Sequence, residues 1–276
     1  MGSKRKFWFR SNEAGGRDWL FKYPRPGTGE HWAEKIAAEV ASALRIRHAR
    51  VDLAEFEGHR GSATESFARG GRELHHGNDL LEGAVYGYDP KQRFGQSSHT
   101  LGNIWTAMDY AFVHPGAARR AKTTIAQYLV LDAIIGNTDR HHENWGLLRR
   151  RTAVGWQAMV APSFDHASSM GRELQNTRRE RLLTENRVGS YVERGRGGIY
   201  WEEDGPQISP LELVRRSVDN HGDYFSSALA RLRRLDAVTV AAIVDRIPDD
   251  WMSAPARTFA VALLCYNLNE LRNLVP

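Results

Sequence analysis

The stretch Gly136-Asn137-Thr138-Asp139-Arg140-His141-His142-Glu143-Asn144-Trp145 decides the fold, because it sets an aspartate and an asparagine five residues apart in one short loop. The apolar spacing of residues 123–135 predicts a helix before this loop, and Gly136 is a residue type that favours the end of a helix. Taken alone, Asp139 and Asn144 could simply cap and turn the chain. Their interpretation therefore depends on the flanking sequence.

A third oxygen-bearing side chain, Asp165, follows in the segment Ala161-Pro-Ser-Phe-Asp-His166. Two strand-like runs, residues 145–148 and 156–160, lie between Asn144 and Asp165 and predict a hairpin that returns Asp165 to the loop. Phosphoryl transfer needs an acid that orients the attacking hydroxyl, together with oxygen ligands for Mg²⁺. Protein kinases use an Asp, an Asn five residues later and an Asp across a hairpin. The spacing therefore indicates an ATP- and Mg²⁺-dependent phosphotransferase.

The N-terminal sequence carries two further charged residues in the order that kinases use. Residues 7–10 and 19–23 predict two strands of a hairpin, and Lys22 lies near the end of the second. Glu34 lies in the first turns of a helix predicted for residues 31–46. Kinases use such a lysine to hold the α- and β-phosphates of ATP, and such a glutamate to fix the lysine through an ion pair.

The turn between the two predicted strands carries Gly15 and Gly16. Glycine-rich turns can present backbone N–H groups to phosphate. The full G-x-G-x-x-G pattern is absent here, so the sequence predicts a reduced phosphate-binding loop. Glu39, on the same helix as Glu34, is the alternative partner for Lys22.

These motifs together resemble the HipA-like serine/threonine kinases, a family of bacterial toxin kinases. The resemblance rests on Asn137-x-Asp139-Arg140-His141-x-x-Asn144, on Pro162-x-x-Asp165, and on Lys22 and Glu34 upstream. The Asp-Arg-His-x-x-Asn element is also similar to phosphoinositide and related lipid kinases, which share the fold distantly. The resemblance covers roughly residues 15–171 and implies a compact member without the N-terminal subdomain of full-length relatives.

The resemblance implies a role for each residue of the motif. Asp139 is expected to be the catalytic base, and Asn144 and Asp165 are expected to bind Mg²⁺. His141 is expected to support the catalytic loop. Ser11 is the one serine at the position where relatives often carry a regulatory autophosphorylated serine.

The segment Thr64-Glu-Ser-Phe-Ala-Arg69 resembles the hinge strand of the same family, whose backbone meets the adenine ring. Glu65 and Phe67 are expected to flank that contact. Together with Lys22, Glu34, Gly15, Gly16 and His141, they complete the expected nucleotide-binding set.

The expected fold is α+β, with two lobes as in protein kinases. A small, strand-rich N-lobe spans residues 1–77 and a mainly helical C-lobe spans residues 78–276. Strands are predicted at residues 51–57 and 63–68, and a helix at residues 104–112. Residues 70–98 and 172–204 are predicted to be loops. Four C-terminal helices are predicted, at residues 210–218, 224–235, 238–247 and 256–274.

Composition narrows the setting of this chemistry. The 276 residues are 41% hydrophobic and 26% charged, which is ordinary for a globular protein. No apolar run approaches the ~18 residues that a membrane-spanning helix needs, so no membrane span is expected. A single cysteine, Cys265, excludes an internal disulfide and fits a reducing compartment, so a cytoplasmic location is expected.

The expected partners follow partly from charge. The formal net charge is +5, so nucleic acid is a possible partner on charge alone. A protein with an acceptor serine or threonine is expected as the substrate, and a regulatory or antitoxin protein as a further partner. The basic residues 177–196 either hold an acidic substrate or form a solvated surface loop.

Other functions remain open at this stage. A catalytically silent kinase fold could serve as a binding module, and a lipid or small molecule could replace protein as the acceptor. A zinc hydrolase would need ligands from Asp139, His141, His142, Asp165 and His166, but the sequence has no H-E-x-x-H motif, and adjacent histidines rarely bind one ion together.

Overall fold

A four-stranded antiparallel sheet forms the N-terminal part of the computed structural model, which describes residues 5–12 and 16–274. Its strands are β1 (Lys6–Arg10), β2 (Asp18–Lys22), β3 (Val51–Phe56) and β4 (His59–Glu65), in the order β1-β2-β4-β3. Side chains alternate along β2, so that Trp19 and Phe21 are buried while Leu20 and Lys22 line a cavity. Helix α1 (Glu30–Ala43) packs against β3 and β4.

A second sheet links the chain after β4 to the segment that follows the Asp139 loop. It consists of β5 (Glu73–His76), β6 (Gly146–Thr152) and β7 (Gly155–Val160), all antiparallel. Gly146 lies where β6 pairs with β5. Glycine is required there, because a Cβ atom at this position would lie 2.2 Å from the carbonyl oxygen of His75. The predicted hairpin before Asp165 is therefore confirmed as β6 and β7.

The rest of the chain is mainly helical. Helix α4 is buried along most of its second half, contacts α7 and α9, and ends at Gly136, whose φ of 65° is left-handed. The predicted end of this helix is thus confirmed. The helices are α2 (Gly77–Ala84), α3 (Leu101–Ala111), α4 (Pro115–Ile135), α5 (Asn176–Thr184), α6 (Val188–Glu193), α7 (Pro210–Leu229), α8 (Ala237–Asp245) and α9 (Ala254–Arg272), with a 3₁₀ turn, η1 (Ala230–Arg234).

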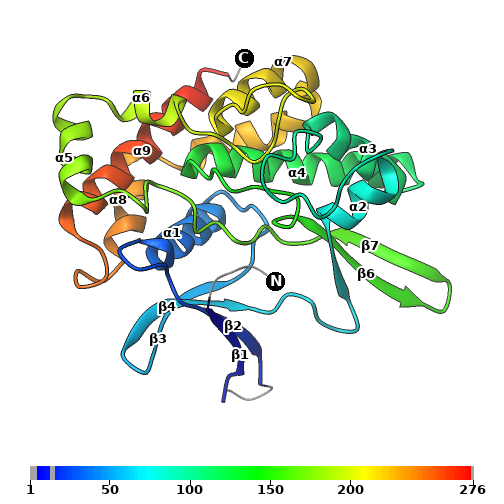
Figure 1. Cartoon of the computed structure of the whole chain (residues 1–276), viewed down its shortest axis with the longest axis horizontal. Coiled ribbons are helices and arrows are strands. Elements are labelled where there is room, and N and C mark those ends of the chain that lie inside the picture. Colours follow the sequence, from blue (N-terminus) through cyan, green and yellow to red (C-terminus); the bar gives the residue numbers. More distant parts are fainter. Residues whose placement is uncertain (1–4, 13–15, 275–276) are drawn as a thin grey trace.

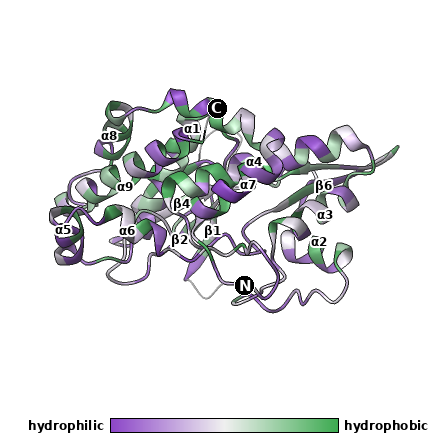
Figure 2. Cartoon of the chain, turned by 90° about the horizontal axis from the view of Figure 1, so that it is seen from above, coloured by the Kyte–Doolittle hydropathy of each residue, from purple (hydrophilic) through white to green (hydrophobic). Residues whose placement is uncertain are grey.

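The two parts of the chain share one apolar core. Helix α1 lies between the four-stranded sheet and the C-terminal helices, while the β6–β7 hairpin projects to one side (Figure 1). Trp32 and Ile36 of α1 belong to the same buried cluster as Leu131 of α4 and Phe259 of α9. The hydrophilic helix α5 lies at the outer edge of the molecule (Figure 2). The expected combination of a small antiparallel sheet and a helical part is confirmed.

Several predicted boundaries are wrong. Residues 70–98 hold β5 and α2, and residues 172–204 hold α5 and α6, where loops were predicted. The predicted strand at residues 63–68 is instead the end of β4, which stops at Glu65. Helix α7 replaces a predicted helix and part of the next one, because the chain continues through a kink at His221. Within the described residues, no helix is both long and apolar enough to cross a membrane.

Candidate active site

Asp139 lies in the loop after α4, where its carboxylate is held but still accessible. Its side chain is 39% exposed. The backbone N–H donates to Oδ1 of Asn137 at 3.1 Å, and the Ser168 hydroxyl lies 3.5 Å from Oδ2 of Asp139. Nε2 of His141 lies 3.9 Å from the other carboxylate oxygen. A carboxylate with this exposure can contact a hydroxyl group that approaches from solvent, and the loop does not have to move.

Asn144 closes the same loop. Its Nδ2 donates to the backbone carbonyl of Asp139 at 2.7 Å, and the side chain is buried. The amide nitrogen is used in this bond, so the oxygen of the same amide is the atom suited to a cation. Asn144 and Asp165 line one cavity, as the predicted hairpin requires.

Arg140 ties this loop to the segment before Asp165. Its guanidinium forms a two-bond ion pair with Asp132 of α4, with Nε–Oδ2 at 2.7 Å and Nη2–Oδ1 at 2.8 Å. It also donates to the carbonyl oxygen of Phe164 at 3.2 Å and to the Ser163 hydroxyl at 3.0 Å. Sequence reasoning missed this pair, although Asp132 is the only charged residue in the apolar run 125–135. A buried acid in such a helix signals a buried partner.

Lys22 and Asp165, which are far apart in the sequence, form an ion pair at 3.0 Å between Nζ and Oδ1. Burial favours the neutral amine, but the charges of Asp165 and Glu34 together outweigh it and raise the pKa of Lys22. Asp165 has a φ of 58°, in the left-handed region that non-glycine residues rarely adopt. Such strain is typical of functional positions.

Glu34 does not hold Lys22 directly, although the sequence pattern predicted that ion pair. Its Oε1 instead accepts a hydrogen bond from the backbone N–H of His166 at 3.0 Å, while Oε2 is buried without a hydrogen-bond partner. Burial opposes ionisation, but the charge of Lys22 and the bond from His166 together lower the pKa of Glu34. The alternative partner, Glu39, is paired with Lys35 at 2.8 Å. The structure therefore pairs Lys22 with Asp165 and leaves a buried carboxylate nearby.

A cavity of about 600 Å³ lies between the two sheets and brings together half of the ten predicted site residues. Lys22, Asn144 and Asp165 line it, and so do Glu65 and Phe67. The Phe67 ring lies 5.3 Å from the ring of Phe164, centroid to centroid. The remaining walls include Leu20, Thr64, Ser66, Ala68, Leu74 and His76. The lining combines apolar side chains with charged ones of both signs, which suits a nucleotide.

The residues that line this cavity do not include four other predicted residues, namely Gly16, Glu34, Asp139 and His141. Gly15 lies outside the described residues. The Glu65 side chain is occupied by arginines, with Arg17 at 3.1 Å and Arg50 at 3.4 Å. Its carboxylate is therefore engaged in ion pairs within the sheet region, and Glu65 lines the cavity because it is the last residue of β4.

His141 is buried beside the loop. Its Nε2 accepts a hydrogen bond from Nη2 of Arg93 at 2.8 Å. Burial, together with the positive charge of Arg93, lowers the pKa of His141 to about 3. A histidine that is neutral at physiological pH and already hydrogen-bonded suits the predicted supporting role. Arg93, in a connection predicted to be a plain loop, is a further residue that sequence reasoning missed.

His99 fastens the other side of the loop. Trp145 can only donate, so its Nε1 donates to Nε2 of His99 at 3.0 Å, and the ring proton must lie on Nδ1, which donates to the carbonyl oxygen of Gly198 at 2.7 Å. Full burial lowers the pKa of His99 to about 3. This chain of bonds links the end of the Asp139 loop to the segment before α7.

The residues present fit Mg²⁺ together with a nucleotide better than a resident transition metal. Mg²⁺ takes one or two protein oxygen ligands and completes its shell with substrate phosphates and water. Asn144 and Asp165 offer such oxygens, and Lys22 offers a positive charge beside them. Within the described residues, no group of three His, Cys, Asp or Glu side chains is arranged to hold a metal.

A curated kinase is similar to part of this chain in sequence. The serine/threonine-protein kinase CtkA of Helicobacter pylori strain J99 is 24% identical to this chain over 120 residues, which are 43% of this chain and 36% of CtkA. The aligned part thus spans about a third of that relative.

Two solved structures share the fold. The crystal structure of the Helicobacter pylori proinflammatory kinase CtkA superposes with a TM-score of 0.80 at 18% identity, covering 97% of this chain and 93% of that chain. HipA, in a Shewanella oneidensis MR-1 toxin–antitoxin complex with HipB and operator DNA, has a TM-score of 0.63 at 15% identity, covering 99% of this chain and 66% of that chain. A family model described as the HipA-like C-terminal domain matches residues 1–200, and the chain therefore belongs to that family.

Proposed function

We propose that this chain is a protein serine/threonine kinase that uses ATP and Mg²⁺ and can phosphorylate itself. The observation that carries the proposal is that Lys22, Asn144 and Asp165 line one cavity, and that Asn144 is hydrogen-bonded to Asp139. Membership of the HipA-like family and the kinase fold shared with CtkA support it.

Each residue then has a chemical task. Asp139 accepts the proton of the acceptor hydroxyl while that oxygen bonds to the γ-phosphorus and ADP leaves. Lys22 would hold the phosphates, and Asn144 and Asp165 would hold Mg²⁺, which when bound would neutralise charge on the transferring group. Glu34, whose charge acts on Lys22 and whose Oε2 has no hydrogen-bond partner, would be available to Lys22 if Asp165 bound the cation. The adenine base of ATP would lie between the ends of β2 and β4, beside the ring of Phe67.

The acceptor is the part of the proposal that most needs a direct test. Mass spectrometry after incubation with Mg-ATP, alone and with candidate proteins, would identify modified residues. We expect phosphoserine or phosphothreonine on the chain itself in the wild type and none in Asp139→Asn. Phosphate on a lipid or small molecule, and none on protein, would move the chain to the lipid and small-molecule kinases. Nucleotide binding without any transfer would make it a silent binding module.

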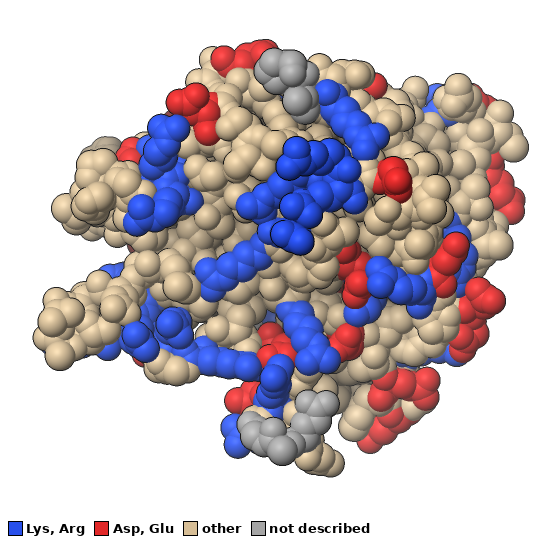
Figure 3. All heavy atoms as spheres, turned by 180° about the vertical axis from the view of Figure 1, so that it is seen from behind, with Lys and Arg blue, Asp and Glu red and all other residues tan. Residues whose placement is uncertain are grey.

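A regulatory partner with a negatively charged surface is a second proposal. Lys and Arg side chains gather near the centre of the face opposite the view of Figure 1 (Figure 3). A hollow of about 370 Å³ is lined by Arg45, Arg47, Arg120 and Arg231, and no acidic residue lines it within the described part of the chain. The HipA relative was solved with HipB and operator DNA. Binding of labelled duplex DNA that weakens steeply with salt and falls in Arg120→Glu would favour nucleic acid; indifference to both would favour a protein partner.

A further inference from the structure

A second cavity lies on the other side of Asp139. It has a volume of about 440 Å³, and its walls include Thr138 and Ser168. Thr138 precedes Asp139 in the chain, and the Ser168 hydroxyl lies 3.5 Å from the Asp139 carboxylate. On the opposite side, Asn144 lines the nucleotide cavity and donates to the Asp139 carbonyl at 2.7 Å. Asp139 lines neither cavity but contacts a wall residue of each, and its carboxylate is on the side of the second cavity, where an acceptor hydroxyl can approach.

In the wall of this second cavity, the acceptor cavity, arginines outnumber acidic side chains. Arg178 and Arg194 line it, and within the described residues neither has a carboxylate partner. Nε of Arg194 donates to the Ser190 carbonyl oxygen at 2.9 Å. Arg172, also in the wall, is neutralised by Glu30 at 2.9 Å and donates to the Ser168 hydroxyl at 3.1 Å.

One acid, Glu173, shares the wall of the acceptor cavity. Its carboxylate accepts a hydrogen bond from the Tyr191 hydroxyl at 2.7 Å. It offsets part of the positive charge of Arg178 and Arg194, but both guanidinium groups remain able to bind a carboxylate from outside.

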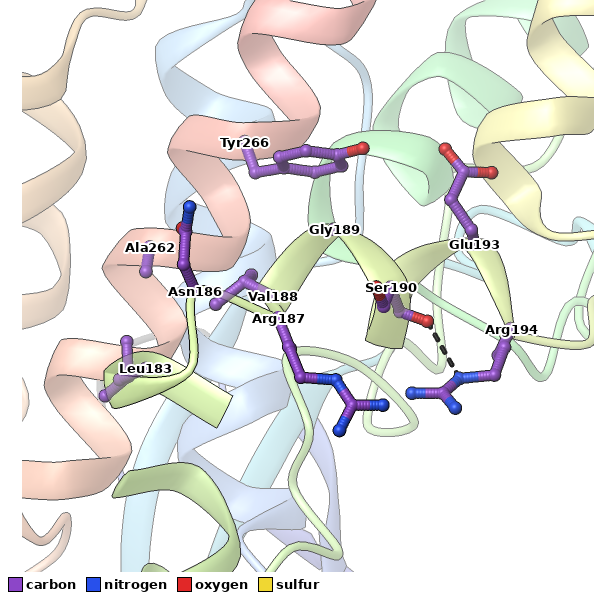
Figure 4. A pocket seen from close by; sticks show the side chains of 10 residues that line it. All are labelled: Leu183, Asn186, Arg187, Val188, Gly189, Ser190, Glu193, Arg194, Ala262 and Tyr266. Atoms are coloured by element: carbon purple, nitrogen blue, oxygen red, sulfur yellow. Dashed lines mark hydrogen bonds between the residues drawn. The ribbon is translucent and has the colours of Figure 1, made fainter. Parts of the chain in front are cut away.

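Arg194 also lines a wider hollow of about 970 Å³ around α6. In this hollow the guanidinium groups of Arg187 and Arg194 point toward one another beside Ser190 (Figure 4). Arg187 is paired with the exposed Glu185 at 3.1 Å. Gly189 allows α6 to lie against α9, because a Cβ atom there would come 2.8 Å from the Tyr266 ring. Glu193 also lines this hollow and is paired with Arg215 at 2.9 Å. A track of arginines, with Glu173 and Glu193 beside them, therefore runs along α6 from the cavity next to Asp139.

We propose that this track binds the acceptor segment of the substrate, and that Arg178 and Arg194 select segments with aspartate or glutamate near the acceptor serine or threonine. The inference rests on the kinase function proposed above and adds the class of substrate. Guanidinium groups bind carboxylates with two parallel hydrogen bonds, which gives selectivity over neutral residues. The same arginines disfavour acceptors flanked by lysine or arginine, because like charges repel.

Three serine peptides of equal length test this selection, one with acidic, one with neutral and one with basic neighbours. Wild type is expected to phosphorylate the acidic peptide with a kcat/KM about tenfold above the neutral one. Arg178→Glu with Arg194→Glu should remove that preference through KM for the peptide and leave KM for ATP unchanged. The control is Arg233→Glu with Arg234→Glu on η1, which changes the net charge equally at two exposed sites and should behave as wild type. Arg178→Gln serves if the charge reversal impairs folding.

Equal use of the acidic and neutral peptides by active wild type would overturn the inference and leave the kinase function standing. Equal loss in the Arg178 and Arg194 double variant and in the Arg233 and Arg234 control would overturn it as well. If wild type phosphorylates itself but no peptide, the affinity for a fluorescent acidic peptide is measured by anisotropy. The inference then requires weaker binding of this peptide in the double variant than in wild type. Absence of any transfer, to peptide or to the chain, would overturn the kinase function itself.

Discussion

Asp165 carries both strain and charge in a single residue. Its left-handed backbone costs free energy, and its carboxylate is held by Lys22 at 3.0 Å. Asparagine also tolerates this backbone region, so Asp165→Asn removes the charge with little change of shape. That makes the substitution a clean probe of the proposed magnesium ligand.

Asp165→Asn is expected to remove the effect of Mg²⁺ on ATP affinity. Titration calorimetry with and without Mg²⁺ should show an effect of at least about tenfold in wild type, because loss of a ligand costs no less than loss of an outer partner. Asp109→Asn on α3, an exposed acid paired with Lys122, is the matched control. A variant that keeps the full Mg²⁺ effect would remove Asp165 from the metal site.

His99 makes stability depend on pH. The folded protein keeps His99 neutral down to a pKa of about 3, whereas in the unfolded chain it takes up a proton near its ordinary pKa of 6.5. The unfolded state therefore binds more protons between these values, so stability is lost as the pH falls. The free energy of unfolding should drop by up to about 1.4 kcal/mol per pH unit below 6.5 from this residue.

Denaturant titrations of wild type and His99→Gln between pH 7 and pH 5 check this expectation. Glutamine can still accept from Trp145 and donate to Gly198, so the variant should fold. It should be less stable than wild type at pH 7 and have a flatter pH dependence. Parallel pH profiles for the two proteins would show that His99 is not the titrating group.

At the scale of elements, the site depends on how α4, the Asp139 loop and the segment before Asp165 are joined. The buried pair of Arg140 and Asp132 makes this junction. Breaking a buried ion pair leaves an uncompensated charge, which costs about 3–5 kcal/mol. Asp132→Ala should therefore lower the free energy of unfolding by that amount and reduce activity, even though Asp132 touches no substrate. Denaturant unfolding and steady-state kinetics measure both effects.

A matched substitution separates this effect from the general loss of an acid. Asp223 lies on α7 and forms a highly exposed pair with Arg119 at 3.5 Å. Exposed pairs contribute little to stability, so Asp223→Ala should change it only slightly. Equal losses in Asp132→Ala and Asp223→Ala would mean that the buried pair does not organise the loop.

The elements differ in how well the sequence predicts them. Helix α4 and the β6–β7 hairpin follow from local apolar patterns, a glycine cap and a turn. Helix α2 has only eight residues, and α5 has nine, is polar and buries only Arg179 and Leu182, so neither has a pattern long enough to be separated from a loop. The kink at His221 joins two segments that look separate in sequence.

The candidate site shows the same division. Asp139 and Asn144 share one short loop, so their proximity follows from sequence spacing. The pair of Lys22 with Asp165 and the freedom of Glu34 Oε2 depend on how the four-stranded sheet meets the helices, which no local pattern encodes. Family resemblance supplied the order of these residues, and long-range packing decides which of them touch.

At the scale of the whole molecule, the division into lobes at residue 77 remains a proposal. The buried apolar cluster runs from Trp32 in α1 to Leu271 in α9 without a break, and β5, just before residue 77, pairs with β6. A shared core predicts that both parts unfold together. Calorimetry should show one transition with equal calorimetric and van't Hoff enthalpies. Two separate transitions would show that the lobes are independently stable.

The central claim is that Asp139 serves phosphoryl transfer in a nucleotide-binding kinase fold. Transfer of label from ATP carrying ³²P on the γ-phosphate, measured beside Mg-ATP affinity in wild type and Asp139→Asn, tests it most directly. We predict protein labelling in wild type, a loss of at least about 100-fold in Asp139→Asn, and nearly equal Mg-ATP affinity in both. Equal labelling in the two proteins, or none in a wild type that still binds Mg-ATP, would contradict the claim.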